Sequence, residues 1–195
     1  MADKYANFAA LELAEPDGAI NIHVQDTQSS TLIIAPHGGK IEPGTSEIAK
    51  AIASDCFRLY LFEGCKKYNN MDLHITSTRF DEPRASDIVA RSDYVVAIHG
   101  CVGSEGKVYI GGLDRELGSF IGEHVRNAGF DTGIHTRADL QGTSSRNICN
   151  RGRRGRGVQL EISRSLRNDL RGPNGREQLT EFGVAIRGAI QKFDG

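Results

Sequence analysis

Apolar and polar positions alternate with two different periodicities along the chain, one typical of strands and one of helices. Short β-branched and aliphatic runs predict strands at 20–24, 31–35, 58–62, 73–76, 94–98, 107–110 and 158–162. Apolar residues at three- and four-residue steps predict helices at 46–54, 86–91 and 115–127, and a closing helix with Leu179, Phe182, Ile186 and Ile190 on its apolar face. Strands that alternate with helices predict a single α/β domain over residues 1–195, a three-layer sandwich whose sheet is mixed but largely parallel.

The bulk composition limits the classes of protein to consider. A hydrophobic fraction of 38% and a charged fraction of 25% are typical of globular domains, and no apolar run approaches the roughly 20 residues that span a bilayer. A formal net charge of −1 excludes recognition of nucleic acid by the charge of the whole molecule. No signal-peptide pattern opens the chain, so we expect a cytoplasmic protein whose four cysteines are free thiols.

A histidine follows shortly after two of the predicted strands. The run 31–35 leads to His37, with Glu42 five residues later, and the run 94–98 leads to His99. Ligands collect at the carboxyl ends of strands in open α/β sheets. Two imidazoles and a carboxylate at that edge predict a three-ligand zinc site with one position open for water. The alternative is a pair of ordinary loop histidines, because the spacing H-x4-E is a weak motif on its own.

A carboxylate also stands inside the predicted strand at 158–162. A strand that is buried on both faces should not hold an ionised Glu161 without a partner. In one interpretation, alternation places Gln159 and Glu161 on a solvated face. In the other, Glu161 lies beside a zinc-activated water and acts as general base and later as proton donor.

Positive charge gathers on both sides of Glu161. Eight arginines lie from Arg146 to Arg171, against only Glu161 and Asp169 as acids. The planar guanidinium group suits bidentate binding of carboxylates, so we expect a substrate that carries carboxylates. The alternatives are a solvated loop and a non-specific contact with RNA, although no aromatic residues are interleaved with the arginines as single-strand binding would favour.

Four motifs follow one another along the chain: Ala35-Pro-His-Gly-Gly-Lys-Ile-Glu42, Tyr60-Leu-Phe-Glu-Gly64, Ala97-Ile-His-Gly100 and Gly157-Val-Gln-Leu-Glu-Ile162. In this order they resemble the poly-γ-glutamate hydrolase family, whose members are encoded by bacteriophages and bacteria and often carry the label phage-related replication protein. The likeness covers nearly the whole chain. It implies a fold like that of the zinc carboxypeptidases, one zinc ion, and hydrolysis of the amide that links a glutamate γ-carboxyl to the next α-amino group.

The resemblance also implies residue roles. It places the zinc ligands on His37, Glu42 and His99, and the catalytic glutamate on Glu161. By analogy with carboxypeptidases, an arginine polarises the scissile carbonyl or holds a substrate carboxylate. The candidates for contact with the substrate are Asn150 with Arg151 as first choice, Arg79 or Arg84 as second, and Arg146 at the start of the arginine-rich segment.

Two other functions stay open on the sequence alone. The same zinc site could act on a small N-acyl amino acid or on a γ-linked peptide of peptidoglycan, because a fold does not fix a substrate. A phage accessory protein that binds nucleic acid through the arginines would instead show steeply salt-dependent binding and no need for zinc. A zinc hydrolase of an anionic poly-γ-glutamyl chain is the leading hypothesis, and we expect a monomer without a membrane partner.

Overall fold

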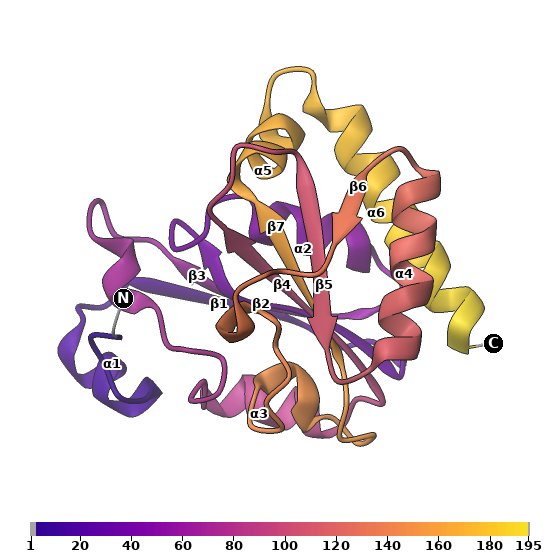
Figure 1. Ribbon diagram of the computed structural model, residues 1–195. Coiled ribbons are helices and arrows are strands. Elements are labelled where there is room, and N and C mark those ends of the chain that lie inside the picture. Colours follow the sequence, from indigo (N-terminus) through magenta and orange to yellow (C-terminus); the bar gives the residue numbers. More distant parts are fainter. Residues whose placement is uncertain (1–2, 195) are drawn as a thin grey trace.

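A seven-stranded mixed sheet forms the centre of the protein, with the strand order β1-β3-β2-β4-β7-β5-β6 (Figure 1). The structure is a computed structural model and describes residues 3–194. Neighbouring strands are parallel except for the pairs β1–β3 and β7–β5, which confirms the predicted mixed, largely parallel sheet. The strands are β1 (Ile20–Gln25), β2 (Thr31–Gly39), β3 (Arg58–Gly64), β4 (Tyr94–Cys101), β5 (Lys107–Gly112), β6 (Asp131–Gly133) and β7 (Val158–Ser163).

Helices cover both faces of this sheet. One face is covered by α2 (Thr45–Ala53), α4 (Arg115–Asn127), α5 (Arg164–Arg171) and α6 (Gly175–Asp194); α4 and α6 lie side by side in Figure 1. The other face is covered by α1 (Phe8–Ala14), α3 (Pro83–Ala90) and the 3-10 helix η3 (Ile148–Arg151). The predicted three-layer α/β arrangement is therefore confirmed.

The strand positions follow from the apolar pattern. The middle strands β2, β4 and β7 are almost entirely buried, as expected where helices cover both faces. The edge strand β1 alternates between partly buried and exposed positions. On the closing helix, Phe182, Ile186 and Ile190 are buried as predicted. Each fully buried side chain of this size contributes about 1.5–3 kcal/mol to folding.

Helix α4 begins and ends at the predicted residues. The Asp114 carboxylate caps its first turn by accepting a hydrogen bond from the Leu117 N–H, and Gly129 follows its end with a φ of +86°. The same carboxylate lies 2.7 Å from Arg154 and 3.7 Å from Arg156. Part of the arginine-rich segment is therefore attached to the start of α4.

The predicted strand at 73–76 is wrong. The 3-10 helix η1 (Asn70–Leu73) ends at the start of this segment, and residues 74–76 belong to no strand. The Thr76 N–H donates to Asp3 Oδ2 at 2.7 Å, and the Ile75 carbonyl lies 2.9 Å from His37 Nε2. Side chains thus supply the partners that a neighbouring strand would supply in a ladder.

Helix α5 is not predicted by the apolar pattern, because only Leu166 and Leu170 of its residues are buried and apolar. Its start is fixed by Ser163, whose hydroxyl accepts a hydrogen bond from the Leu166 N–H at 3.3 Å. The short elements α1 and β6 also escape the prediction, since seven and three residues give too little periodicity.

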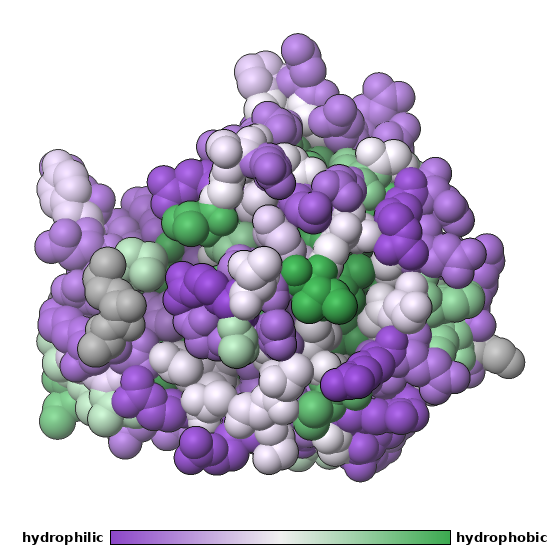
Figure 2. All heavy atoms as spheres, viewed as in Figure 1, coloured by the Kyte–Doolittle hydropathy of each residue, from purple (hydrophilic) through white to green (hydrophobic). Residues whose placement is uncertain are grey.

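The surface viewed in Figure 2 is mostly polar, with small separate apolar patches. Among residues 3–194, no helix has both the length and the apolar character needed to cross a membrane. The thiols of Cys101 and Cys149 are buried and those of Cys56 and Cys65 are exposed, and all four are free.

Candidate active site

His37, Glu42 and His99 come together at the carboxyl ends of β2 and β4. These strands are parallel neighbours, with Ile34 opposite Ala97 just before the two histidines. His37 Nδ1 lies 3.1 Å from His99 Nδ1 and 3.3 Å from Glu42 Oε1. His99 Nδ1 lies 3.8 Å from Glu42 Oε2. One atom from each of the three side chains, all within 4.8 Å of one another, is thus available to a metal ion.

A β-bulge sets the direction of the His37 side chain. The pairing of β2 with β3 changes register between Ala35 and Gly38, and a bulge of this kind re-aims a side chain. The strand then turns at Gly39, where φ is +62° and an added Cβ would lie 2.7 Å from the Gly64 carbonyl oxygen. The Glu42 N–H donates to the His37 carbonyl at 2.9 Å, which folds the carboxylate back towards the imidazole.

The outer nitrogen of each imidazole is held by another group. His37 Nε2 lies 2.9 Å from the Ile75 carbonyl oxygen, which can only accept, so this nitrogen carries the proton. His99 Nε2 lies 3.3 Å from the Ser77 hydroxyl. Both Nδ1 atoms therefore face Glu42, and outer contacts of this type fix the orientation of metal-binding imidazoles.

The charges of these groups suit a cation. Burial alone would raise the pKa of Glu42, but the two imidazoles and the Gly100 N–H, which donates at 2.8 Å, lower it to about 2. Burial and the neighbouring His37 lower the pKa of His99 to about 3. Burial lowers the pKa of His37, and the Glu42 carboxylate reverses this to a net rise. Glu42 is thus ionised and His99 neutral near pH 7, as metal ligation requires, whereas His37 would have to give up its Nδ1 proton to an incoming ion.

Two of the three distances between donor atoms are close to those around a tetrahedral metal ion. Zinc lies about 2.0–2.1 Å from its nitrogen and oxygen ligands, so two ligands at a tetrahedral angle are about 3.3 Å apart. The distances of 3.1 Å from His37 Nδ1 to His99 Nδ1 and 3.3 Å from His37 Nδ1 to Glu42 Oε1 are close to that value. The third distance, from His99 Nδ1 to Glu42 Oε2, is longer at 3.8 Å. The three residues, which all line one cavity, could hold zinc after a small shift of the Glu42 carboxylate.

Glu161 lies on β7 next to His99 on β4. The two residues are opposite each other in parallel strands, so their side chains leave the same face of the sheet. Both Gln159 and Glu161 are buried, at 3% and 4% exposure, so the interpretation that placed them on a solvated face is wrong. Gln159 Nε2 donates to Glu161 Oε1 at 2.9 Å. Burial and the charge of Glu42 raise the pKa of Glu161 to about 8.

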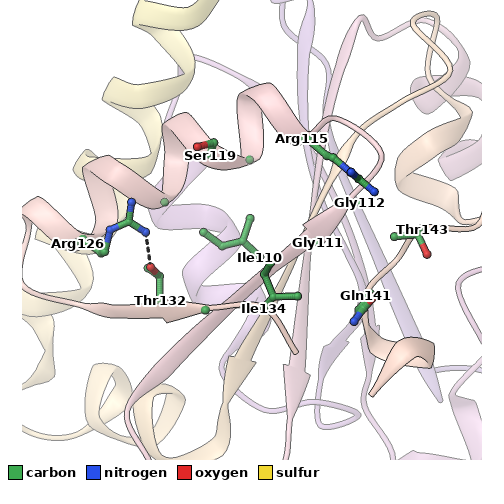
Figure 3. A pocket seen from close by; sticks show the side chains of 13 residues that line it. Ile110, Gly111, Gly112, Arg115, Ser119, Arg126, Thr132, Ile134, Gln141 and Thr143 are labelled. Atoms are coloured by element: carbon green, nitrogen blue, oxygen red, sulfur yellow. Dashed lines mark hydrogen bonds between the residues drawn. The ribbon is translucent and has the colours of Figure 1, made fainter. Parts of the chain in front are cut away.

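A cavity of about 370 Å³ connects these four residues, and its other polar lining includes Asp3, His74, Ser77, Arg137, Asp139 and Asn147. A larger cavity of about 530 Å³ lies between α4 and strands β5 and β6 (Figure 3). Arg115 and Arg126 line that second cavity, but no histidine, cysteine or carboxylate does. Of these two cavities, the smaller one combines candidate metal ligands with a candidate base.

His74 and Asp3 form a pair in this cavity that sequence reasoning did not single out. The His74 ring lies over that of His37, with centroids 4.0 Å apart, and His74 Nδ1 lies 2.8 Å from Asp3 Oδ1. Burial and His37 lower the pKa of His74 to about 4. No motif could reveal the pair, because its two members are far apart in the sequence and meet only through the fold.

Asp3 is expected to stabilise the protein in a pH-dependent way. Burial raises the pKa of its carboxyl, but hydrogen bonds from Thr76 and His74 lower that pKa by more than burial raises it, so the net shift is downward. A lowered folded-state pKa gives stability that is complete above the unfolded-state value of about 3.9 and is lost as the pH falls through the folded-state pKa. Asp3→Ala should therefore cost about 2 kcal/mol near pH 7 and little in strong acid.

Urea unfolding of wild type and Asp3→Ala from pH 7 to pH 3 measures this effect, with Asp17→Ala in an exposed turn as the control. A difference between wild type and Asp3→Ala that stays constant over this range would contradict the expected linkage.

The first-choice substrate residues lie outside the lining of the smaller cavity. Asn150 accepts hydrogen bonds from the backbone N–H groups of Leu113 and Gly157, and its amide donates to two backbone carbonyls. Arg151 donates to the Phe80 carbonyl. Both side chains thus support loops around the site, and their roles towards a substrate stay predictions.

The second-choice residues have local partners too. Arg79 pairs with Asp3, and Arg84 lies 3.1 Å from Glu82. Arg146 is exposed and does not line the cavity. The arginine that does line it is Arg137, next to the 3-10 helix η2 (Ala138–Leu140), where it pairs with Asp139. Arg137 lies outside the arginine-rich segment, so charge clustering in the sequence gives no signal for it.

Comparison with known proteins adds to this geometry. Residues 5–181 match the model of a family described as poly-gamma-glutamate hydrolase. The SPbeta prophage-derived UPF0714 protein YoqZ of Bacillus subtilis (strain 168) is 41% identical over 170 residues, which are 87% of this chain and 62% of YoqZ. This chain therefore spans less than two thirds of the length of that relative.

Solved structures agree along the whole chain. A structure of a bacteriophage poly-gamma-glutamate hydrolase matches with a TM-score of 0.93 and 32% identity, covering 100% of this chain and 99% of that one. A structure described as YNDL-apo (Zinc-free) matches with a TM-score of 0.92 and 33% identity, covering 98% and 99%. A carboxypeptidase-like protein of Burkholderia mallei shares the fold alone, with a TM-score of 0.50 and 14% identity over 89% of this chain and 59% of that one.

The matched region carries His37, Glu42, His99 and Glu161 in the arrangement described above. By sequence and by structure, the chain belongs to the poly-gamma-glutamate hydrolase family.

Proposed function

We propose that this protein is a zinc-dependent hydrolase that cleaves γ-glutamyl amide bonds of poly-γ-glutamate. The observation that carries the proposal is the convergence of His37, Glu42 and His99 in one cavity with the buried carboxyl of Glu161. The family supports the substrate, and the zinc-free description of the YndL structure supports the metal. His37, Glu42 and His99 would hold the ion. When bound, zinc supplies a Lewis acid that makes water nucleophilic near neutral pH.

Glu161 is suited to the proton transfers of amide hydrolysis. The raised pKa makes its ionised form a stronger base than an exposed carboxylate, and the charge of a bound cation would favour that ionised form near pH 7. Gln159 fixes one of its oxygens by donating to it. We infer that it takes the proton of the attacking water and passes it to the leaving amine. Asn147 donates to Gln159 Oε1 at 2.8 Å, so a chain of amides holds the base in place.

Arg137 is the cavity residue suited to the substrate's free α-carboxylate. Its guanidinium is largely exposed, and within the described residues its one ion pair is with Asp139, two residues away. A planar guanidinium binds a carboxylate in a bidentate manner. The exposed ion pair with Asp139 contributes little stability, so giving it up to bind a substrate carboxylate costs little. We therefore favour Arg137 over Arg151 for this contact.

Arg137→Ala is expected to raise KM for the polymer about 5- to 10-fold, since one exposed, charge-assisted contact is worth about 1 kcal/mol. The kcat value should change less, because a carboxylate away from the scissile bond is bound equally in ground and transition states. Arg115→Ala, in the other cavity, is the control. An Arg151→Ala variant with lowered kcat and an Arg137→Ala variant like wild type would restore the sequence-based choice.

The chain length of purified poly-γ-glutamate tests the function directly. The polymer is incubated with the protein and zinc, with and without a chelator, and is then separated by gel filtration. We expect shortening that the chelator abolishes, and the size distribution distinguishes internal from terminal cleavage. If neither sample is shortened, the polymer is not the substrate. Small γ-glutamyl and N-acyl amino acids, and γ-linked peptides of peptidoglycan, are then the compounds to assay.

A further inference from the structure

Arg167 lies beneath the candidate active site and is almost completely buried, at 4% exposure. It stands within the first turns of α5, directly after β7. A buried guanidinium is costly unless its donors are satisfied. In the described part of the chain, no carboxylate comes within 4 Å of this group, so an ion pair does not explain its position.

The partners of Arg167 are three backbone carbonyls from three different segments. Its Nε donates to the Ile162 carbonyl at 3.0 Å, one Nη donates to the Cys101 carbonyl at 3.1 Å, and the other Nη donates to the Pro43 carbonyl. These carbonyls follow the functional residues closely. Pro43 comes directly after Glu42, Ile162 directly after Glu161, and Cys101 two residues after His99.

The guanidinium also packs directly against Gly100. A Cβ at this glycine would lie 2.6 Å from Arg167 Cζ, so only glycine allows the contact. The Gly100 N–H in turn donates to Glu42 Oε2 at 2.8 Å. The Arg167 side chain therefore packs against Gly100, the residue whose N–H binds the Glu42 carboxylate.

We propose that Arg167 is a positioning residue that fixes the segments carrying Glu42, His99 and Glu161 relative to one another. One planar group with donors in a fixed fork sets the spacing of three carbonyls in a way that apolar packing cannot. A metal site needs its ligands within about 0.5 Å of the productive geometry, so this spacing controls zinc affinity and turnover. The role in turnover rests on the proposed function, whereas the arrangement of the three segments does not.

Arg167→Met and Arg167→Lys test this role, with Arg164→Met at the exposed start of the same helix as the control. Zinc affinity is measured by competition with a chromogenic chelator, together with kcat and KM on the polymer, below the unfolding temperature of each variant. Arg167→Met should lower zinc affinity about 10-fold or more and lower kcat similarly, with KM within about twofold of wild type. Arg167→Lys should lie between, because one ammonium group cannot reach all three carbonyls.

The second part of the test is a measurement on the protein without metal. The imidazole NMR resonances of His37 and His99 in the zinc-free protein should shift in both Arg167 variants and stay in place in Arg164→Met. Variants that lose only thermal stability, with zinc affinity, kcat and imidazole resonances of wild type, would overturn the proposal. If Arg167→Met does not fold, Arg167→Lys decides. A wild type that binds zinc without cutting the polymer refutes the proposed substrate, while the affinities and resonances still decide the role of Arg167.

Discussion

Replacing Glu161 with glutamine is expected to stop turnover while the protein keeps its zinc. The amide has nearly the same shape as the carboxyl, so the hydrogen bond from Gln159 Nε2 has an oxygen to accept it. The amide cannot take up a proton from water. General-base catalysis contributes about 10²–10⁴-fold, so kcat should fall by about that factor, with little change in KM.

Burial strengthens this expectation. Glu161 is a carboxyl whose pKa is raised to about 8 by desolvation and by the charge of Glu42, and a neutral amide avoids both costs. Glu161→Gln should therefore fold at least as stably as wild type. Within the described residues Glu161 forms no ion pair, so the substitution leaves no partner charge buried and unpaired. A loss of activity without a loss of stability separates a catalytic role from a structural one.

Metal analysis, thermal unfolding and kcat on poly-γ-glutamate measure these three quantities. Glu105→Gln, in the exposed loop between β4 and β5, is the matched control and should behave like wild type. Near-normal turnover of Glu161→Gln would show that another group takes the proton. Loss of zinc along with turnover would place Glu161 among the groups that hold the ion.

The apolar pattern predicted the sheet well because the strands that form its middle are buried on both faces. Runs such as 31–35 and 94–98 have no other stable location than between two layers of helices. The same reasoning placed His37 and His99 together, since parallel strands deliver their carboxyl ends to one edge. Helix α5 escaped prediction because its sequence is mostly polar, and one of the three side chains that it buries is the charged Arg167.

The rest of the site could not be predicted, because it is built by contacts between distant segments. Asp3 and His74 meet only through the fold, and their pairing replaces the strand that 73–76 resembles. Arg137 has no other arginine near it in the sequence, whereas the conspicuous arginines 151–156 contact Asp93, Asp114 and the Phe80 carbonyl. Charge density in the sequence indicated a cationic region but not which guanidinium lines the cavity.

Removing His99 is expected to remove the zinc. His99 Nδ1 is one of three donors that converge, and its neutral state near pH 7 leaves a lone pair available. With two protein ligands left, zinc affinity should fall by at least about 100-fold, beyond the loss typical of changes outside the ligand shell. His99→Ala should therefore lack zinc after dialysis and show no turnover without added metal.

His74→Ala is the matched control, because the same kind of side chain is removed from the same cavity. His74 packs on His37 and pairs with Asp3, but it contributes none of the three converging donors. It should keep close to one zinc per chain, with an affinity reduced by less than the roughly 10- to 100-fold typical of groups that hydrogen-bond to a ligand, because His74 only packs on the His37 ring. Zinc retained by His99→Ala but lost from His74→Ala would mean that the ion is held by His37, His74 and Asp3 instead, on the other side of the His37 ring. Equal retention by both variants would contradict a metal site at the ends of β2 and β4, and with it the reason why Glu161 faces this cavity.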